Sequence, residues 1–262
     1  MASLKEVKGR IASVNSTRKI TSAMKMVASA KLHKAQAAIE SMLPYERRLH
    51  HILTDFMSNC TEVTSPFIVK REVKKVAVVV FASNTSLCGG FNANVIRHLV
   101  DLLAEYKPLG LENILVFPVG KKVADAVRKL GFRIEGDFQH MADKPSYQEA
   151  ADLAADLMKR FLHGDVDKVE LLYNHFKSTA SQILTRETYL PIDLNNEKKE
   201  EERTIDYILE PSAEELMQEM LPKVLRMKMF TVLLDSNAAE HAARTMACLL
   251  YTSPSPRDRT RS

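Results

Sequence analysis

The chain has 262 residues, a formal net charge of +4, 45% hydrophobic residues, no Trp and three cysteines. This length allows one or two cores, and the scattered cysteines argue against a disulfide-rich secreted protein and favour a reducing compartment. There is no apolar run of roughly 18 residues and no hydrophobic signal core at the N-terminus. We therefore expect any membrane association to come through a partner.

The first predicted element is one long amphipathic helix over residues 2–56, part of a shaft segment that we place at residues 1–60. Apolar or small residues recur there at steps of three and four, which is the pattern of a coiled-coil seam. The seam residues are Leu4, Val7, Ile11, Val14, Ala28, Leu32, Ala35, Ile39, Met42, Leu49, Leu53 and Phe56. A helix of this length exceeds what a compact domain needs and favours a protein that works through mechanical contact with partners.

The middle of this helix differs from its ends, and the whole helix is basic. The seam is polar at Arg18, Thr21 and Lys25, where the apolar residues move to another face. Residues 1–54 contain ten Lys and Arg against three acidic residues. Such a stripe favours an acidic protein surface, anionic lipid or nucleic acid, although a solvated face that keeps a long helix soluble explains it equally well.

Residues 70–195 predict a small α/β domain. Continuous apolar runs at 75–82 and 113–119, followed by strands at 168–176 and 182–190, alternate with helices. The predicted helices are 94–106, a short one between Gly120 and Gly131, and 146–162, where Ser146 and Glu149 form an expected capping box. This alternation is typical of a doubly wound sheet.

No catalytic constellation, cofactor site or metal site is expected. The turn at Gly89 and Gly90 follows a strand and opens a helix, but neither GxxxxGK[ST] nor GxGxxG is present, so a tight turn is favoured over a phosphate loop. Cys88 is interpreted as a packed thiol, because no partner residue for a nucleophile can be placed. The pair His50 and His51 points in different directions on a helix and predicts no shared metal.

A second shaft helix is predicted within residues 205–250. Residues 205–209 read as a short extended piece, and Ser212 with Glu215 forms a second expected capping box. Its stripe is made of Leu225, Met229, Val232, Ser236, Ala239, Ala243, Met246 and Leu250. We expect this stripe to pair with the first seam, which gives a long antiparallel coiled coil of N- and C-terminal helices with an inserted α/β domain.

Three stretches of sequence resemble the gamma subunit of the F1 sector of bacterial F-type ATP synthase. They are residues 11–14 with 19–28 (IASV and KITSAMKMVA), residues 87–92 (LCGGFN) and residues 239–244 (AEHAAR). The resemblance implies a non-catalytic central rotor shaft that couples proton-driven rotation of the membrane c-ring to conformational change at the catalytic beta subunits. It implies alpha, beta and epsilon subunits and the c-ring as partners, at the cytoplasmic face of the bacterial inner membrane.

The resemblance also assigns individual residues. It places Ile20, Met24, Lys25 and Val27 on the shaft near the levers of the beta subunits. It places Tyr45, Glu46, Tyr207 and Glu210 at the foot of the shaft, facing the c-ring. The alternatives remain a core residue for Met24 and a solvated acid before a helix for Glu210.

The chain departs from the family in two places. Where the family usually has an Arg before the LCGG turn, this chain has Asn84, Thr85 and Ser86. After Cys248 the family signature is lost, and we interpret residues 251–262 as a disordered, non-native tail that leaves Leu4 to Val14 without a partner helix. The competing class is a basic coiled-coil protein that binds nucleic acid or an anionic membrane surface, but it leaves the α/β domain unexplained.

Overall fold

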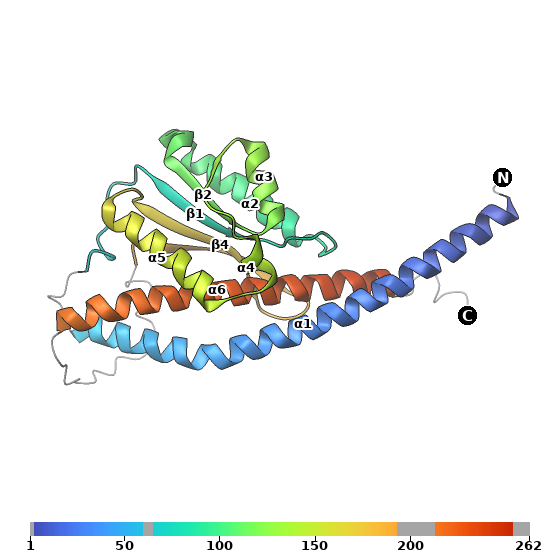
Figure 1. The fold of residues 1–262 in the computed structure, drawn as a ribbon, viewed down its shortest axis with the longest axis horizontal. Coiled ribbons are helices and arrows are strands. Elements are labelled where there is room, and N and C mark those ends of the chain that lie inside the picture. Colours follow the sequence, from blue (N-terminus) through green and yellow to red (C-terminus); the bar gives the residue numbers. More distant parts are fainter. Residues whose placement is uncertain (1–2, 60–64, 193–212, 254–262) are drawn as a thin grey trace.

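The computed structural model describes residues 3–59, 65–192 and 213–253. Two long helices lie side by side, and a five-stranded sheet with its own helices sits against their flank (Figure 1). The helices are α1 (Leu4–Asn59), α2 (Phe91–Tyr106), α3 (Lys121–Leu130), α4 (Gln139–Asp143), α5 (Tyr147–His163) and α6 (Ala213–Thr252). The strands are β1 (Val76–Phe81), β2 (Ile114–Val119), β3 (Arg133–Ile134), β4 (Lys168–Phe176) and β5 (Gln182–Leu190).

Helices α1 and α6 run antiparallel, as predicted, and α1 continues alone past the end of α6 (Figure 1). The helix α1 passes through Pro44 without ending. Along its lone section the seam residues face solvent, with exposed fractions of 73% for Leu4, 56% for Ile11 and 58% for Val14. The expected exposure of this stripe is therefore confirmed.

The sheet has the order β3-β2-β1-β4-β5, with the first four strands parallel and β5 antiparallel at one edge. The four predicted strands are present, each within one residue of its expected limits. Helices α2 and α3 cover one face, while α4, α5 and α6 cover the other. The two-residue strand β3 and the five-residue helix α4 were not predicted from the sequence.

The stripe of α6 contradicts the expected pairing. Its residues Leu225, Met229 and Val232 pack in the core of the α/β domain, together with the buried face of the sheet. Contact with the α1 seam is made instead by Ala238 and Ala242. The reason is that α6 lies between α1 and the sheet, so between residues 232 and 245 it is buried on nearly every side.

Of the predicted helix-end signals, the cap at Gly131 is correct and the capping box at Ser146 is wrong. Gly131 ends α3 with φ +77° and donates its N–H to the carbonyl of Arg128, as expected. The capping box at Ser146 was wrong, because the Ser146 side chain makes no cap and Glu149 pairs with His140 instead. At the C-terminus α6 extends to Thr252, so residues 251 and 252 of the predicted tail are helical, and Ser253 follows as an exposed bend. Residues 254–262, the extended piece at 205–209 and Ser212 lie outside the described residues.

Candidate functional site

The predicted contact residues of the shaft occupy the part of α1 just beyond its packed section. Ile20, Met24 and Val27 are spaced four and three residues apart and share a helix face. Ile20 and Val27 are 60% and 59% exposed, whereas Met24 is half-buried. A solvent-facing apolar row on a basic helix can take up apolar side chains of another protein.

Lys25 lies beside this row, at the edge of a shallow hollow. The hollow has a volume of about 500 Å³ and is lined by Lys25, Met26, Ser29, Ala30 and His33. Met26 is 66% exposed. A cation next to accessible apolar surface suits an acidic, amphipathic partner segment.

Small residues bring the two shaft helices together. Leu32 and Ala35 of α1 pack against Ala238 and Ala242 of α6, and Ala238 and Ala242 are both fully buried. Alanine at such positions lets the helix backbones approach closely, and the contact then has little space for rearrangement.

A row of polar residues on α6 joins the shaft to the α/β domain; we call Asp235, Asn237, Glu240 and Arg244 the joint. Arg244 carries the most contacts, because its guanidinium donates to the carbonyl of Ser86 at 2.5 Å and to Thr85 Oγ1 at 2.9 Å. It also pairs with Glu240 at 2.6 Å, with both side chains almost buried. Burial raises the pKa of the Glu240 carboxyl, against the lowering effect of Arg244.

The other two members of the joint hold different parts of the domain. Asp235 accepts a hydrogen bond from the backbone N–H of Phe176 at 2.8 Å and pairs with His175 Nδ1 at 2.6 Å, which fixes the end of β4. Asn237 donates to the carbonyl of Ala142 at 2.9 Å, which fixes α4. The domain is therefore attached to one shaft helix at three separate places.

His241 lies next to the joint and is buried. Its Nδ1 has no hydrogen-bond partner within the described part of the chain. Burial, together with the positive charges of Lys31 and Arg244, lowers the pKa of His241 to about 4, although Asp143 acts in the other direction. His241 is therefore neutral in the folded protein at physiological pH.

The turn at Gly89 and Gly90, weighed above as a phosphate loop, belongs to a packing contact with α6. Cys88 is buried, and its Sγ accepts a hydrogen bond from Asn92 Nδ2 at 3.1 Å, so the expected packed thiol is confirmed. Cys88 and Phe91 pack against Ala239 and Ala243 of α6. The Gly89 backbone has φ +60°, a conformation that favours glycine.

The shaft helix also occupies the place where doubly wound sheets hold ligands. Such ligands bind outside the carboxyl ends of the strands. Here Ser236, Asn237 and Glu240 of α6 cover the ends of β1 and β2 and leave a cavity of about 10 Å³. This space is hardly enough for one water molecule, so a nucleotide has no room there.

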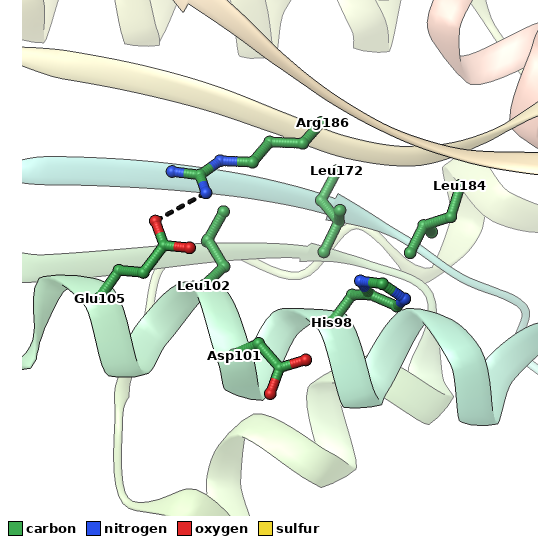
Figure 2. A pocket seen from close by; sticks show the side chains of 7 residues that line it. All are labelled: His98, Asp101, Leu102, Glu105, Leu172, Leu184 and Arg186. Atoms are coloured by element: carbon green, nitrogen blue, oxygen red, sulfur yellow. Dashed lines mark hydrogen bonds and ion pairs between the residues drawn. The ribbon is translucent and has the colours of Figure 1, made fainter.

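A second polar cluster lies between α2 and β5, next to a hollow of about 110 Å³ (Figure 2). The buried Glu170 carboxylate pairs with Lys168 at 2.6 Å and Arg186 at 2.9 Å, and Arg186 also pairs with Glu105 at 2.7 Å. Burial acts to raise the pKa of Glu170, but hydrogen bonds from Arg186, Lys168 and Tyr106 hold it below its usual value. The charges compensate one another, so this cluster fastens the edge strand to α2.

Two of the four predicted foot residues lie in the described part of the chain. Tyr45 is 53% exposed on α1, and Glu46 lies in the same helix. Tyr207 and Glu210 lie outside the described residues. In the described ranges no helix has the length and apolar character needed to cross a bilayer, and no three side chains gather as metal ligands.

Comparison with known proteins gives consistent results. The family model described as ATP synthase matches residues 3–249. The ATP synthase gamma chain of Phocaeicola vulgatus is 79% identical, over 96% of this chain and 88% of that relative. The gamma chain of Bacteroides thetaiotaomicron is 60% identical over the same shares.

The chain belongs to the ATP synthase gamma chain family. Two solved structures share the fold of this gamma chain. One is the central stalk of the Tetrahymena thermophila mitochondrial ATP synthase, with a TM-score of 0.62 and 21% identity. The match covers 89% of this chain and 100% of that one. The other is the rotor of the Euglena gracilis enzyme, with a TM-score of 0.59 and 18% identity over 93% of this chain and 88% of that one.

The segment of this gamma chain just before the LCGG turn, residues 84–86, is held by hydrogen bonds from two sides. Asn84 donates to the carbonyl of Gln139 at 2.8 Å and accepts from the backbone N–H of Lys121 at 2.8 Å. Arg244 reaches the next two residues from α6. Arg244 was noted in the sequence only as part of a motif, because nothing local in the sequence points to partners about 160 residues away.

Proposed function

We propose that this chain is the central rotor shaft of an F-type ATP synthase. In this role it couples proton-driven rotation of the c-ring to conformational change at the catalytic beta subunits. The observation that carries the proposal is the antiparallel pair of α1 and α6, with an α/β domain fixed to its side, in a member of the gamma chain family. Family membership favours this role over a stand-alone protein that binds nucleic acid or a membrane surface.

Torque transmission requires that the domain and the shaft turn as one body. The joint supports this, because Asp235, Asn237 and Arg244 connect α6 to three parts of the domain. The α6 side chains within the domain core add apolar contact along the same helix. Packed interiors of this kind transmit strain instead of absorbing it.

We place the contact with the beta levers at Ile20, Met24, Lys25 and Val27. The exposure of Ile20 and Val27 and the hollow beside Lys25 support this placement. We place Tyr45, Glu46, Tyr207 and Glu210 at the foot, where the chain meets the c-ring and the epsilon subunit. The alpha subunits complete the ring around the shaft. We place this chain peripherally at the cytoplasmic face of the bacterial inner membrane.

The chain is proposed to be non-catalytic, with no cofactor of its own. The covered strand ends under α6 support this, since they leave no space for a nucleotide. We also propose the division into a shaft segment at 1–60, an α/β domain at 70–195, a second shaft segment at 205–250 and a non-native tail at 251–262, with the qualification that α6 belongs to shaft and domain core alike.

The test is Met24→Lys in a complete ATP synthase reconstituted in vesicles. A new ammonium facing acidic levers would form a charged contact that must break at each step, and about 1.4 kcal/mol per contact slows a step tenfold. We expect normal folding and assembly, but less ATP made per proton moved. Ala104→Lys, which adds the same charge at an exposed position of α2, is the control and should couple normally. Equal coupling in the two variants would remove Met24 from the lever contact.

A further inference from the structure

A hollow between α4 and α5 combines an apolar floor with an acidic rim. Its volume is about 410 Å³. Met141 and Leu153 are buried in its floor, and Phe138 lies partly buried beside them with its ring 6.3 Å from that of Phe117. Its rim carries four carboxylates, from Asp137, Glu149, Asp152 and Asp156.

The sequence of α5 places the acidic rim and the apolar floor together. Glu149, Asp152, Leu153 and Asp156 are spaced at three, four and seven residues, so they share one face of the helix. That face is turned toward α4 and the segment before it, which contribute Asp137, Phe138 and Met141. The result is an apolar groove bordered by negative charge.

Much of this negative charge has no cationic partner in the described part of the chain. Asp156 pairs with Arg160 at 2.9 Å and Glu149 Oε1 pairs with His140 at 2.9 Å. Asp152 accepts a hydrogen bond only from the Gln148 amide, and Asp137 only from a backbone N–H. The second oxygen of Glu149 is buried with no hydrogen-bond partner among the described residues. A cation placed in the hollow would gain from the charges of Asp137 and Asp152, which accept hydrogen bonds only from neutral donors among the described residues.

We propose that this hollow is a docking site for a basic, amphipathic segment of a protein partner. An Arg or Lys of that segment lays its aliphatic stem on Phe138, Met141 and Leu153 and places its charged end among the carboxylates. The groove is open and larger than one such side chain needs, so an apolar neighbour on the same segment also finds contact. The proposal goes beyond the rotor role and does not depend on it.

Charge complementarity favours this partner and this place. The shaft is strongly basic, with ten Lys and Arg against three acidic residues in residues 1–54, and it repels a basic segment. The hollow is the opposite in sign, so the same field directs the segment toward α5. A free organic cation would satisfy the carboxylates but leave the apolar floor in contact with water.

The test uses the full chain and a short fluorescent helical peptide built from Leu, Arg and Ala. The probe for charge is the same peptide with each Arg replaced by Gln. Binding is followed by fluorescence anisotropy at low and high salt. We expect the Arg peptide to bind, the Gln peptide to fail, and hydrogen exchange of residues 147–156 to slow when the Arg peptide is bound.

Matched variants locate the binding. Glu149→Gln combined with Asp152→Asn keeps the shape of the hollow but removes two charges, and should weaken the dissociation constant by at least about tenfold. The control combines Glu112→Gln with Asp125→Asn, the same two chemical changes outside the hollow, and should bind as the unchanged chain does. Thermal melting of both variants shows that each is folded.

Two results would overturn the proposal. Equal binding by the two variants, or no binding of the Arg peptide to the unchanged chain, would show that the hollow is not a docking site. Spermidine is added as a separate probe. If spermidine binds and loses affinity in the Glu149→Gln, Asp152→Asn variant while the peptide does not bind, the hollow takes a small organic cation and the protein-partner proposal is wrong.

Discussion

Arg244 joins two parts of the molecule that lie far apart in the sequence. One guanidinium binds the Ser86 carbonyl, the Thr85 hydroxyl and its own helix neighbour Glu240, and the Arg244 and Glu240 side chains are only 12% and 10% exposed. Removing the cation would leave a nearly buried carboxylate without its partner. This single side chain therefore contributes to the joint both by hydrogen bonding and by charge.

We expect Arg244→Ala to lower the free energy of unfolding by about 3 kcal/mol, because it breaks a nearly buried ion pair from one side. Urea unfolding measures this change. Hydrogen exchange should also become faster at residues 83–87, which lose the hydrogen bonds from Arg244. In the double variant Arg244→Met with Glu240→Gln no charge is left unpaired, so a loss as large as that of Arg244→Ala would contradict this explanation.

His241 gives the fold a defined sensitivity to acid. Its pKa is about 4 in the folded protein, below the ordinary value of 6.5, so the unfolded chain binds a proton between these pH values and the folded chain does not. Stability from this group is present above pH 6.5 and falls as the pH drops toward 4, by at most about 1.4 kcal/mol per pH unit.

The measurement compares unfolding free energies of the unchanged chain and His241→Gln at several pH values. The difference between them should change in favour of the variant as the pH falls from 6.5 to 4. Glu240, whose raised pKa acts in the opposite direction, is present in both proteins and cancels in the comparison. Parallel pH profiles would show that His241 titrates normally.

At the scale of elements, the contact between α1 and α6 depends on small side chains. Ala238 and Ala242 are fully buried against Leu32 and Ala35, so the two helices are close where the domain is attached. The seam is buried in this section of the shaft, whereas in the lone section of α1 beyond it Leu4, Val7, Ile11 and Val14 are all exposed.

We expect Ala242→Leu to destabilise the protein by about 1–3 kcal/mol, since the added atoms must push the helices apart or force strained rotamers. Ala37→Leu is the matched control, because Ala37 is exposed on α1 and the same change there should stay within about 0.5 kcal/mol. Thermal unfolding measures both. Similar effects at the two positions would mean that the interface is loose enough to accept a larger side chain.

The elements also show what the sequence could and could not predict. Strands β1, β2, β4 and β5 were all predicted to within one residue, and β1 and β2 were the clearest because buried parallel strands are continuous apolar runs. Strand β3 and helix α4 were missed because two and five residues are too few to show a period. The partner of the α6 stripe was assigned wrongly, since a helix buried on nearly all sides has no single apolar face.

The candidate site was predictable only where it is local. The row of Ile20, Met24 and Val27 could be found from helix spacing and from a specific motif, and it lies on one helix face as expected. The joint could not be found this way, because Asp235 and Arg244 bind segments about 60 and 160 residues away. Their partners are set by the packing of the whole chain.

At the scale of the whole molecule, shaft and domain share one helix. The carboxyl ends of β1 and β2, which hold ligands in many doubly wound proteins, lie under α6 with a cavity of only about 10 Å³. In this chain the position that usually holds a ligand is therefore occupied by the contact between α6 and the sheet.

We therefore expect the isolated chain neither to bind nor to hydrolyse Mg-ATP. Calorimetric titration should show no binding tighter than about 1 mM. Cys88 and Phe91, which flank Gly89 and Gly90, pack on α6, and this turn should not respond to nucleotide in hydrogen exchange. A dissociation constant in the micromolar range would restore that turn as a candidate nucleotide site.

Because α6 is part of the domain core, the core can close only after part of α6 has been synthesised. Domains tend to fold as units while the ribosome extends the chain. Here the sheet is complete once residue 190 has been made, yet one wall of its core comes from Met217, Leu221, Leu225 and Met229. A nascent chain that ends after residue 190 but before residue 217 has an uncovered apolar sheet face, which chaperones and proteases bind. Every molecule with a closed domain core therefore already carries the middle of its second shaft helix.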